Sequence, residues 1–290
     1  MTAPGVWLLN LDAELEVEAR ARYRGPLVAL SKRPELATAL AALIPSGDRV
    51  LSSLPSRGEL SGQRAFCWSP TPSASGALKL AGAAVVRPLP IEVLRCVMNR
   101  GFSAELGLHF EAASWLLDVE AALAKVRLPS PSGRWLARRA FGFAGKARRV
   151  FAELHSADEA FVTRAATEGG VLIEPFFECS LDVGLHGFVS AAGLVLGEPV
   201  INTVGGGGVF RSSRRAEATD LSADERAAIL LEATRAASAL TAAGYCGPFG
   251  IDGFRYELGG RAAFQPRSEI NARYSMAWAL GMGSRRPDLD

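Results

Sequence analysis

Three side chains near the end of the sequence are of the types that bind a divalent cation. Asp252 lies in the segment 247–256 (GPFGIDGFRY), and Glu269 and Asn271 lie in the segment 264–274 (FQPRSEINARY). Both segments have the pattern of β-strands, and residues two apart on a strand point to the same face, so Glu269 and Asn271 face the same way. Two carboxylates and an amide oxygen suit Mg²⁺, or Mn²⁺ in its place, because such ions bind carboxylates together with substrate phosphates.

A short turn at Leu258–Gly260 joins the two segments into one hairpin, which is expected to bring the aspartate beside the other two residues. By the same alternation Arg267 shares their face, and Arg273 joins them if the strand extends that far. An arginine at this place stabilises charge on a transferring phosphoryl group, so both arginines are candidate catalytic residues. The alternative is a solvated surface hairpin, against which the apolar and glycine neighbours on both strands argue.

The hairpin resembles the signature of the ATP-grasp superfamily, which includes D-alanine–D-alanine ligase, biotin carboxylase and glutathione synthetase. The signature is an acidic residue on one strand and Glu-x-Asn, often followed by x-Arg, on the next. Here it reads Asp252 and then Glu269, Asn271 and Arg273. The resemblance covers roughly residues 90–283. It implies that the Asp, Glu and Asn bind one or two Mg²⁺ ions that bridge the phosphates of ATP.

The segment 134–150 (RWLARRAFGFAGKARRV) resembles the strand and glycine loop that close over the phosphates in this superfamily. The superfamily usually has a lysine in that strand, and here Arg138 or Arg139 occupies its place. Lys146 in the loop is a candidate second phosphate contact. Arginine keeps the positive charge and binds phosphate bidentately, but its geometry differs from that of lysine.

The segment 171–188 (VLIEPFFECSLDVGLHGF) resembles the hinge strand that binds adenine and ribose. The resemblance gives Glu174 the position at the adenine amine, places Phe177 near the backbone hinge and places Asp182 near the ribose-binding acid. His186 shares a strand face with Asp182 by alternation and is expected to face the cleft.

The first part of the chain alternates short apolar strands with helices, which indicates a parallel α/β sheet. Strands are predicted at 6–10, 49–53 and 83–87, a helix at 35–43 and a Ser/Pro-rich surface loop at 69–75. Further along, we predict helices at 91–99, 118–125, 157–167 and 221–243, and strands at 134–140, 171–177, 181–189, 249–256 and 262–270.

The predicted fold class is therefore α/β and α+β. Residues 1–90 are expected to form a Rossmann-like pre-ATP-grasp lobe, and residues 91–290 an ATP-grasp domain whose two α+β lobes clasp ATP. The first lobe is assigned only by its pattern of strands and helices.

Composition excludes several classes of function. The net charge of +2 over 290 residues gives no basis for binding nucleic acid or an anionic membrane. No segment has the pattern of a signal peptide or a membrane span. The absence of a CxxC pair argues against a structural zinc site and a disulfide scaffold, so we expect a reduced, cytoplasmic setting; the four cysteines are Cys67, Cys96, Cys179 and Cys246.

Four glycines at Gly205–Gly208 precede an arginine-rich segment with Arg211, Arg214 and Arg215. The run does not match the P-loop pattern, so a flexible loop is the preferred interpretation. Two interpretations of the arginines stay open, namely contact with an anionic substrate and a solvated basic loop.

The expected function is an ADP-forming ligase that activates a carboxylate as an acyl phosphate and joins it to an amine or another nucleophile. The expected partners are therefore a small carboxylate and a small amine. The alternatives are a small-molecule kinase on the same fold and a nucleotide-binding protein without turnover. The oligomeric state stays open, with a homodimer as one option.

Overall fold

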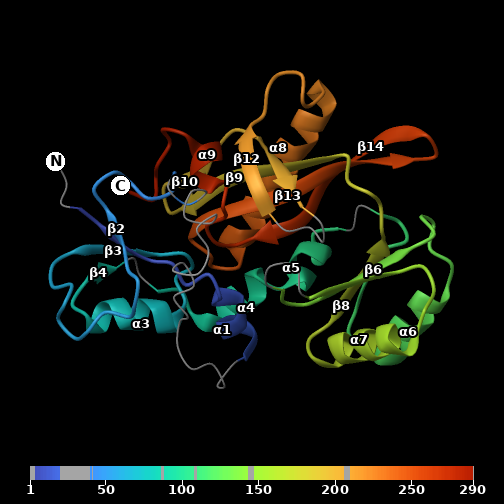
Figure 1. Ribbon diagram of the computed structural model, residues 1–290, viewed down its shortest axis with the longest axis horizontal. Coiled ribbons are helices and arrows are strands. Elements are labelled where there is room, and N and C mark those ends of the chain that lie inside the picture. The colour runs from blue at the N-terminus through green and yellow to red at the C-terminus, as the bar shows by residue number, and fades with distance from the viewer. Residues whose placement is uncertain are drawn as a thin grey trace.

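The computed structural model has three β-sheets within the residues that it describes (Figure 1). The described residues are 4–19, 40, 42–85, 88–107, 110–142, 147–205 and 210–289.

The first sheet is parallel and has the strand order β2-β1-β3-β4, as the α/β pattern predicted. The central strand β1 is buried along its whole length, as is usual for a parallel sheet covered by helices. The elements of this part are β1 (Val6–Leu8), α1 (Ala13–Ala19), β2 (Arg49–Val50), β3 (Arg64–Cys67), α3 (Pro72–Leu80) and β4 (Ala84–Val85). Most of the helix predicted at 35–43 lies outside the described residues.

The prediction of a surface loop at 69–75 is wrong, because helix α3 begins there. Thr71 is its N-cap and accepts a hydrogen bond from the backbone of Ala74, and Pro72 occupies the first turn. Proline fits that position because the first N–H groups of a helix have no partner within the helix. Ser69 and Ser75, which suggested a polar loop, are buried.

The second sheet is antiparallel and has the order β5-β8-β6-β7. Two helices pack against it and form a core with Trp135 and Ile173. Asp118 is the N-cap of the helix that begins at Val119, and its Oδ1 accepts a hydrogen bond from Ala121 N. The elements are β5 (Ser114–Leu116), α6 (Val119–Arg127), β6 (Trp135–Arg139), β7 (Arg148–Phe151), α7 (Ser156–Thr167) and β8 (Val171–Pro175).

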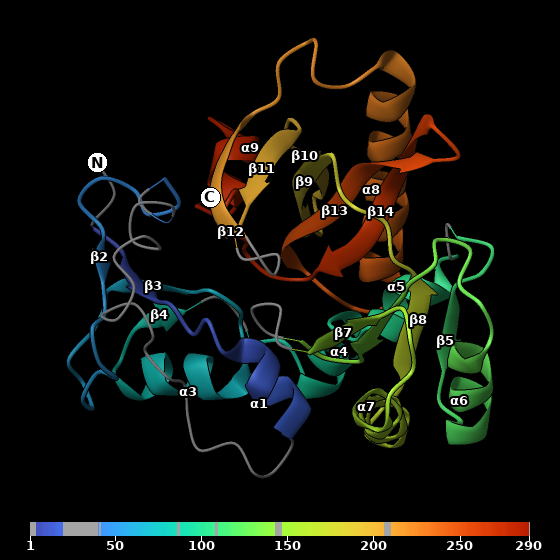
Figure 2. The same ribbon diagram turned by 45° about the vertical axis from the view of Figure 1, so that its right-hand side comes forward.

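The third sheet has the order β12-β11-β9-β13-β14, with β10 also paired to β9. Helix α8 runs across one face of it (Figure 2) and buries Ile229 and Leu240 there. Ser222 and Glu225 form a capping box at the start of α8, which lies within the helix predicted at 221–243. The elements are β9 (Leu181–Ser190), β10 (Gly193–Leu196), β11 (Val200–Val204), β12 (Phe210–Arg215), α8 (Ala223–Ala242), β13 (Gly247–Leu258) and β14 (Arg261–Asn271).

The arginine-rich segment that was predicted as a loop is strand β12, which pairs with β11 at the edge of the third sheet. Arg214 forms an ion pair with Asp220, and Arg215 donates to Leu280 O. Both arginines are therefore held by the protein.

Three short helices connect the sheets: α4 (Ile91–Val97), α5 (Arg100–Glu105) and α9 (Trp278–Met282). Trp278 of α9 donates to Gly187 O of the third sheet and packs in one core with Trp7 of the first sheet. The segment after β14 thus fastens the first sheet to the third. No helix among the described residues has the length and apolar character needed to cross a membrane.

Candidate active site

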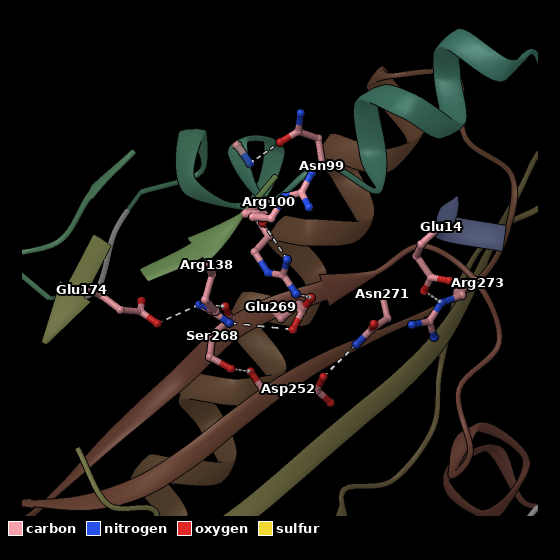
Figure 3. A network of polar contacts seen from close by, with 12 residues as sticks. Glu14, Asn99, Arg100, Arg138, Glu174, Asp252, Ser268, Glu269, Asn271 and Arg273 are labelled. Carbon is pink, nitrogen blue, oxygen red and sulfur yellow. Dashed lines mark hydrogen bonds and ion pairs between the residues drawn. The ribbon is translucent and has the colours of Figure 1, made fainter. Parts of the chain in front are cut away.

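The hairpin β13–β14 brings the three predicted metal ligands together (Figure 3). Asp252 lies opposite Glu269 in the antiparallel register, and Asn271 lies opposite Gly250. The Nδ2 of Asn271 donates a 2.7 Å hydrogen bond to Oδ2 of Asp252. This bond leaves the amide oxygen of Asn271 as its candidate cation ligand.

Asp252 lies near two other carboxyl groups, those of Asp182 and Glu269. Burial raises the pKa of its carboxyl to about 7, and the charges of Asp182 and Glu269 add to the increase. Near neutral pH, Asp252 is therefore poised between its protonated and ionised forms. A divalent cation would favour the ionised form, because metal ligands must be deprotonated.

Glu269 is already paired with arginines. Its Oε1 accepts a 2.9 Å hydrogen bond from Nη2 of Arg100, and Nη1 of Arg138 lies 3.8 Å from its Oε2. Burial opposes ionisation of Glu269, but the charges of Arg100, Arg138 and Arg273 outweigh it, so the pKa of Glu269 is lowered. Two positive charges therefore lie at the carboxylate that was predicted to bind the metal.

Arg100 is a further residue of the site, and no sequence motif indicates it. It begins helix α5 next to the N-cap Asn99, and 169 positions separate it from Glu269. Burial lowers the pKa of Arg100, and the charge of Glu269 opposes that shift. Its local sequence has the features of a helix start and nothing that indicates a distant acid.

Arg138 joins the predicted hinge residue to the predicted metal site. Its Nη2 lies 2.8 Å from Oε1 of Glu174 and donates to Ser268 O at 3.0 Å. Both side chains are buried, and burial raises the pKa of Glu174 against the attraction of Arg138. In this state, therefore, Glu174 binds an arginine of its own chain.

The next arginine in the sequence lies elsewhere. Arg139 pairs with Glu18 at 2.7 Å and with Glu168 at 2.5 Å, away from the hairpin. Of the two arginines predicted to replace the lysine of the superfamily, Arg138 is the one that lies beside Glu269. Lys146, the third predicted phosphate contact, lies outside the described residues.

The prediction that Arg267 shares the face of Glu269 is wrong, because a bulge interrupts the alternation. Between the pair Asp252–Glu269 and the pair Phe254–Gln265, β13 advances by two residues and β14 by four. Gly253 makes the crowding possible, since a Cβ there would lie 2.7 Å from Gln265 O.

The side chain of Arg267 is buried between α8 and α5. Its Nε donates to Glu232 at 2.7 Å, its Nη1 to the carbonyl and hydroxyl of Ser103 at 2.6 Å, and its Nη2 to Gly107 O at 2.7 Å. Four of its five N–H groups are thereby used within the protein. This geometry suits a clamp between elements rather than contact with a phosphoryl group.

Arg273 lies two residues beyond Asn271 and reaches the first sheet. Its Nε donates to Oε1 of Glu14 on α1, and its guanidinium lies 5.7 Å from the ring centre of Trp68. Arg273 therefore links the metal residues to the end of the first sheet.

Two predicted nucleotide contacts take part in other interactions. Asp182 accepts a 2.8 Å hydrogen bond from Asn202, and burial raises its pKa. Phe177 lies in an aromatic cluster, with its ring centre 4.5 Å from that of Tyr256 and 5.3 Å from that of Phe110. The cluster occupies the space between the second and third sheets.

His186 does not face an open cleft. It is 2% exposed, and burial lowers its pKa to about 4, so it is neutral at physiological pH. It packs against glycines, because added Cβ atoms at Gly250 and Gly281 would lie within 3.0 Å of its ring.

Solved structures share this arrangement of sheets. VanG D-Ala:D-Ser ligase from Enterococcus faecalis superposes with a TM-score of 0.54 at 14% identity over 99% of this chain and 94% of its own. D-cycloserine synthetase gives 0.52 at 14% identity over 95% and 96%. N5-carboxyaminoimidazole synthetase from Staphylococcus aureus, complexed with ADP, gives 0.52 at 10% identity over 95% and 72%. The chain has the ATP-grasp fold.

At these identities the likeness is one of fold. No family profile matches the sequence, and no curated protein matches it. The resemblance seen in the sequence is thereby confirmed for the ATP-grasp fold, whereas the roles of individual residues depend on the geometry described above.

A small pocket opens between β8 and β14 of this ATP-grasp fold. Its lining includes Glu174, Gln265 and Arg267, together with Phe110 of the aromatic cluster. Among the described residues no group donates to Oε1 of Gln265, although this oxygen is buried.

The oxygen atoms of Asp252, Glu269 and Asn271 suit a hard cation that is also bound by a phosphate group. Within the described part of the chain, no three His, Cys, Asp or Glu residues form a metal-binding group. The hairpin offers two carboxylates and one amide instead. Because Mg²⁺ commonly uses one or two carboxylates plus substrate phosphates, this set fits Mg²⁺ bound with a nucleotide.

Proposed function

We propose that the protein is an ATP- and Mg²⁺-dependent ligase that phosphorylates a small carboxylate and transfers the acyl group to an amine or another nucleophile. The observation that carries the proposal is the position of Asp252, Glu269 and Asn271 on one hairpin with Arg100 and Arg138 at its edge. Carboxylate and amide oxygens next to two guanidinium groups suit a polyphosphate with its counter-ion. The ligase activities of the structural neighbours agree with this proposal.

Each residue has a proposed task. Asp252, Glu269 and Asn271 hold Mg²⁺, which when bound neutralises charge on the phosphates. Arg100 and Arg138 release Glu269 and take phosphate oxygens in its place, since guanidinium groups bind either oxyanion bidentately.

The remaining assignments concern the nucleotide and the substrate. Glu174, Phe177 and Asp182 bind the adenosine part, and Arg273 stabilises charge on the phosphoryl group as it transfers to the substrate carboxylate. Arg267 keeps α5, which carries Arg100, fixed against α8. Lys146 stays a candidate phosphate contact, and residues 1–90 are proposed as a Rossmann-like pre-ATP-grasp lobe.

Two features of this chain favour a second candidate, a nucleotide-binding protein without turnover. Arginine stands where the superfamily usually has lysine, and Glu269 is neutralised by arginines. ADP formation above background in a panel of amino acids, small carboxylates and amines separates the two candidates. An enzyme that needs both an acid and a nucleophile for rapid ADP formation is a ligase, whereas ADP formation with an alcohol alone indicates a kinase.

A further inference from the structure

The candidate nucleotide site is closed in this structure. The cavity between β8 and β14, which Glu174, Gln265 and Ser268 line, has a volume of about 20 Å³. That volume holds about one water molecule. A nucleotide base is far larger, so it enters this space only if the second sheet moves away from the third.

Arg138 holds the second sheet against the third (Figure 3). It lies on β6, and its Nη2 donates to Ser268 O of β14 at 3.0 Å. The same nitrogen lies 2.8 Å from Oε1 of Glu174 on β8, and Nη1 lies 3.8 Å from Oε2 of Glu269. The side chains of Arg138 and Glu174 are only 10% and 9% exposed, so salt screens their ion pair much less than a surface pair.

Arg100 makes a second connection to the carboxylate of Glu269. Its Nη2 donates to Oε1 of Glu269 at 2.9 Å, and its Nη1 donates at 2.7 Å to Arg139 O, at the end of β6. Gly142 lies against this guanidinium group, since an added Cβ there would be 2.7 Å from Nη1. Arg100 therefore joins the chain that follows β6 to the hairpin of β13 and β14.

These internal pairs leave a donor of each arginine unused. Among the described residues, no group accepts a hydrogen bond from Nε of Arg100 or of Arg138, although both nitrogens are buried. Buried donors are nearly always paired, so an unused donor needs an explanation. Guanidinium groups bind carboxylates and phosphates through the same fork of donors. Phosphate therefore suits both arginines, and Glu174 and Glu269 compete with it for them.

We propose that Glu174 and Glu269 are internal inhibitors of the nucleotide site, which hold Arg138 and Arg100 in the place of phosphate and keep the second sheet closed on the third. The proposal rests on the proposed function, which assigns these two arginines to the phosphates. Because the carboxylates belong to the same chain, their effective concentration is high, and a free anion must displace them. A polyphosphate that binds the arginines releases Glu269 at the metal residues and Glu174 at the base.

The test is equilibrium binding of tripolyphosphate without divalent metal, measured by calorimetry. This probe has no base or ribose, so a contact between Glu174 and adenine does not affect the result. Glu174→Gln keeps the shape of the side chain and removes its charge. Glu168→Gln is the matched control, because Glu168 pairs at 2.5 Å with Arg139, the neighbouring arginine of the same strand.

The expected result is that Glu174→Gln binds tripolyphosphate about 10-fold or more tightly than the wild type, whereas Glu168→Gln binds it as the wild type does. In an Arg138→Gln background, Glu174→Gln should no longer tighten binding, because the carboxylate acts through that arginine. Unchanged or weaker binding by a folded Glu174→Gln protein overturns the proposal. Equal tightening in both backgrounds shows repulsion through space and also overturns it.

A second variant covers the case in which Glu174→Gln does not fold. Glu269→Gln frees Arg100 in the same way, and without metal its expected effect is again tighter binding of tripolyphosphate. Unchanged or weaker binding by a folded Glu269→Gln protein then overturns the proposal. Absence of binding to the wild type and to every variant overturns it as well.

Failure of the ligase proposal is visible separately, because this experiment does not measure ADP formation. Tighter binding by Glu174→Gln without ADP formation in the substrate panel supports the internal inhibitors and contradicts the ligase. ADP formation by the wild type, together with unchanged tripolyphosphate affinity in Glu174→Gln, supports the ligase and overturns the internal inhibitors.

Discussion

Asn271 donates a 2.7 Å hydrogen bond to Asp252 across the hairpin of β13 and β14, although 19 positions separate the two residues in sequence. The bond orients the amide so that its oxygen points away from the aspartate. Glu269 lies opposite Asp252, so the three side chains come from one short stretch of the hairpin.

We predict that Glu269→Gln and Asn271→Ala abolish ADP formation and leave the protein folded. Each changes one oxygen ligand of the proposed metal site, so the loss should exceed the roughly 10–100-fold effect typical of an outer-shell partner. Glu257→Gln is the control, because Glu257 is exposed on the same hairpin. Steady-state ADP formation and circular dichroism provide the measurement, and wild-type rates in either variant would remove the metal assignment.

Nucleotide affinity should depend on Arg138 and not on Arg139. Arg138→Ala is predicted to weaken ADP binding about 10-fold or more through loss of a charged donor, and Arg138→Lys should lose less. Arg139→Ala is the matched control, because Arg139 pairs with Glu18 and Glu168 instead. Equilibrium binding of ADP is the readout. Equal affinity of Arg138→Ala and wild type would move the phosphate role to Arg139 or Lys146.

The raised pKa of Asp252 predicts a pH dependence of stability. The folded carboxyl titrates near pH 7, well above its ordinary value of 3.8, so the folded state holds a proton that the unfolded state has lost. The stabilisation is therefore present at low pH and is lost as pH rises through about 7. Between pH 6 and 8 the free energy of unfolding should fall by about 1 kcal/mol through this group.

The measurement is urea unfolding at pH 6 and 8 without divalent metal, for the wild type and Asp252→Asn. The asparagine variant lacks the titration, so the difference between the two proteins cancels contributions from other groups, including His186 with its lowered pKa. If that difference is the same at both pH values, Asp252 does not titrate in this range.

Arg267 should behave as a structural clamp. Arg267→Met removes the buried guanidinium that donates to Glu232, Ser103 and Gly107, so it is predicted to destabilise the protein by about 3 kcal/mol or more. Denaturant midpoints give the comparison. A fully stable but inactive Arg267→Met protein would instead support the catalytic role that strand alternation suggested.

The hairpin and its three metal candidates could be predicted because their signal is local. Strand periodicity, the glycine turn and the apolar neighbours all lie within the segment 247–274. The burial of Arg267 could not be predicted in the same way, because its partner Glu232 lies on α8, 35 positions away in the sequence. Gly253, and Pro266 inside a strand, are the local signs of an interrupted ladder.

Other differences have the same origin. Arg100 reaches Glu269 only after α5 has packed beside the hairpin, so its role depends on tertiary structure. The segment 69–75 has the composition of a loop, but Thr71 and Pro72 start a helix there. The Ser/Pro composition of this segment predicts a loop, whereas an N-cap threonine followed by proline predicts the start of a helix.

The most direct test of the central claim is trapping of the activated acid. The site candidates are metal ligands and cations, which stabilise phosphoryl transfer and do not themselves attack, so the phosphoryl group should pass to the substrate carboxylate. The protein is incubated with ATP, Mg²⁺, an acid that supports turnover and hydroxylamine as the nucleophile. An acyl phosphate intermediate gives ADP together with the hydroxamate of that acid. Formation of AMP and pyrophosphate instead would show adenylation and rule out the acyl phosphate.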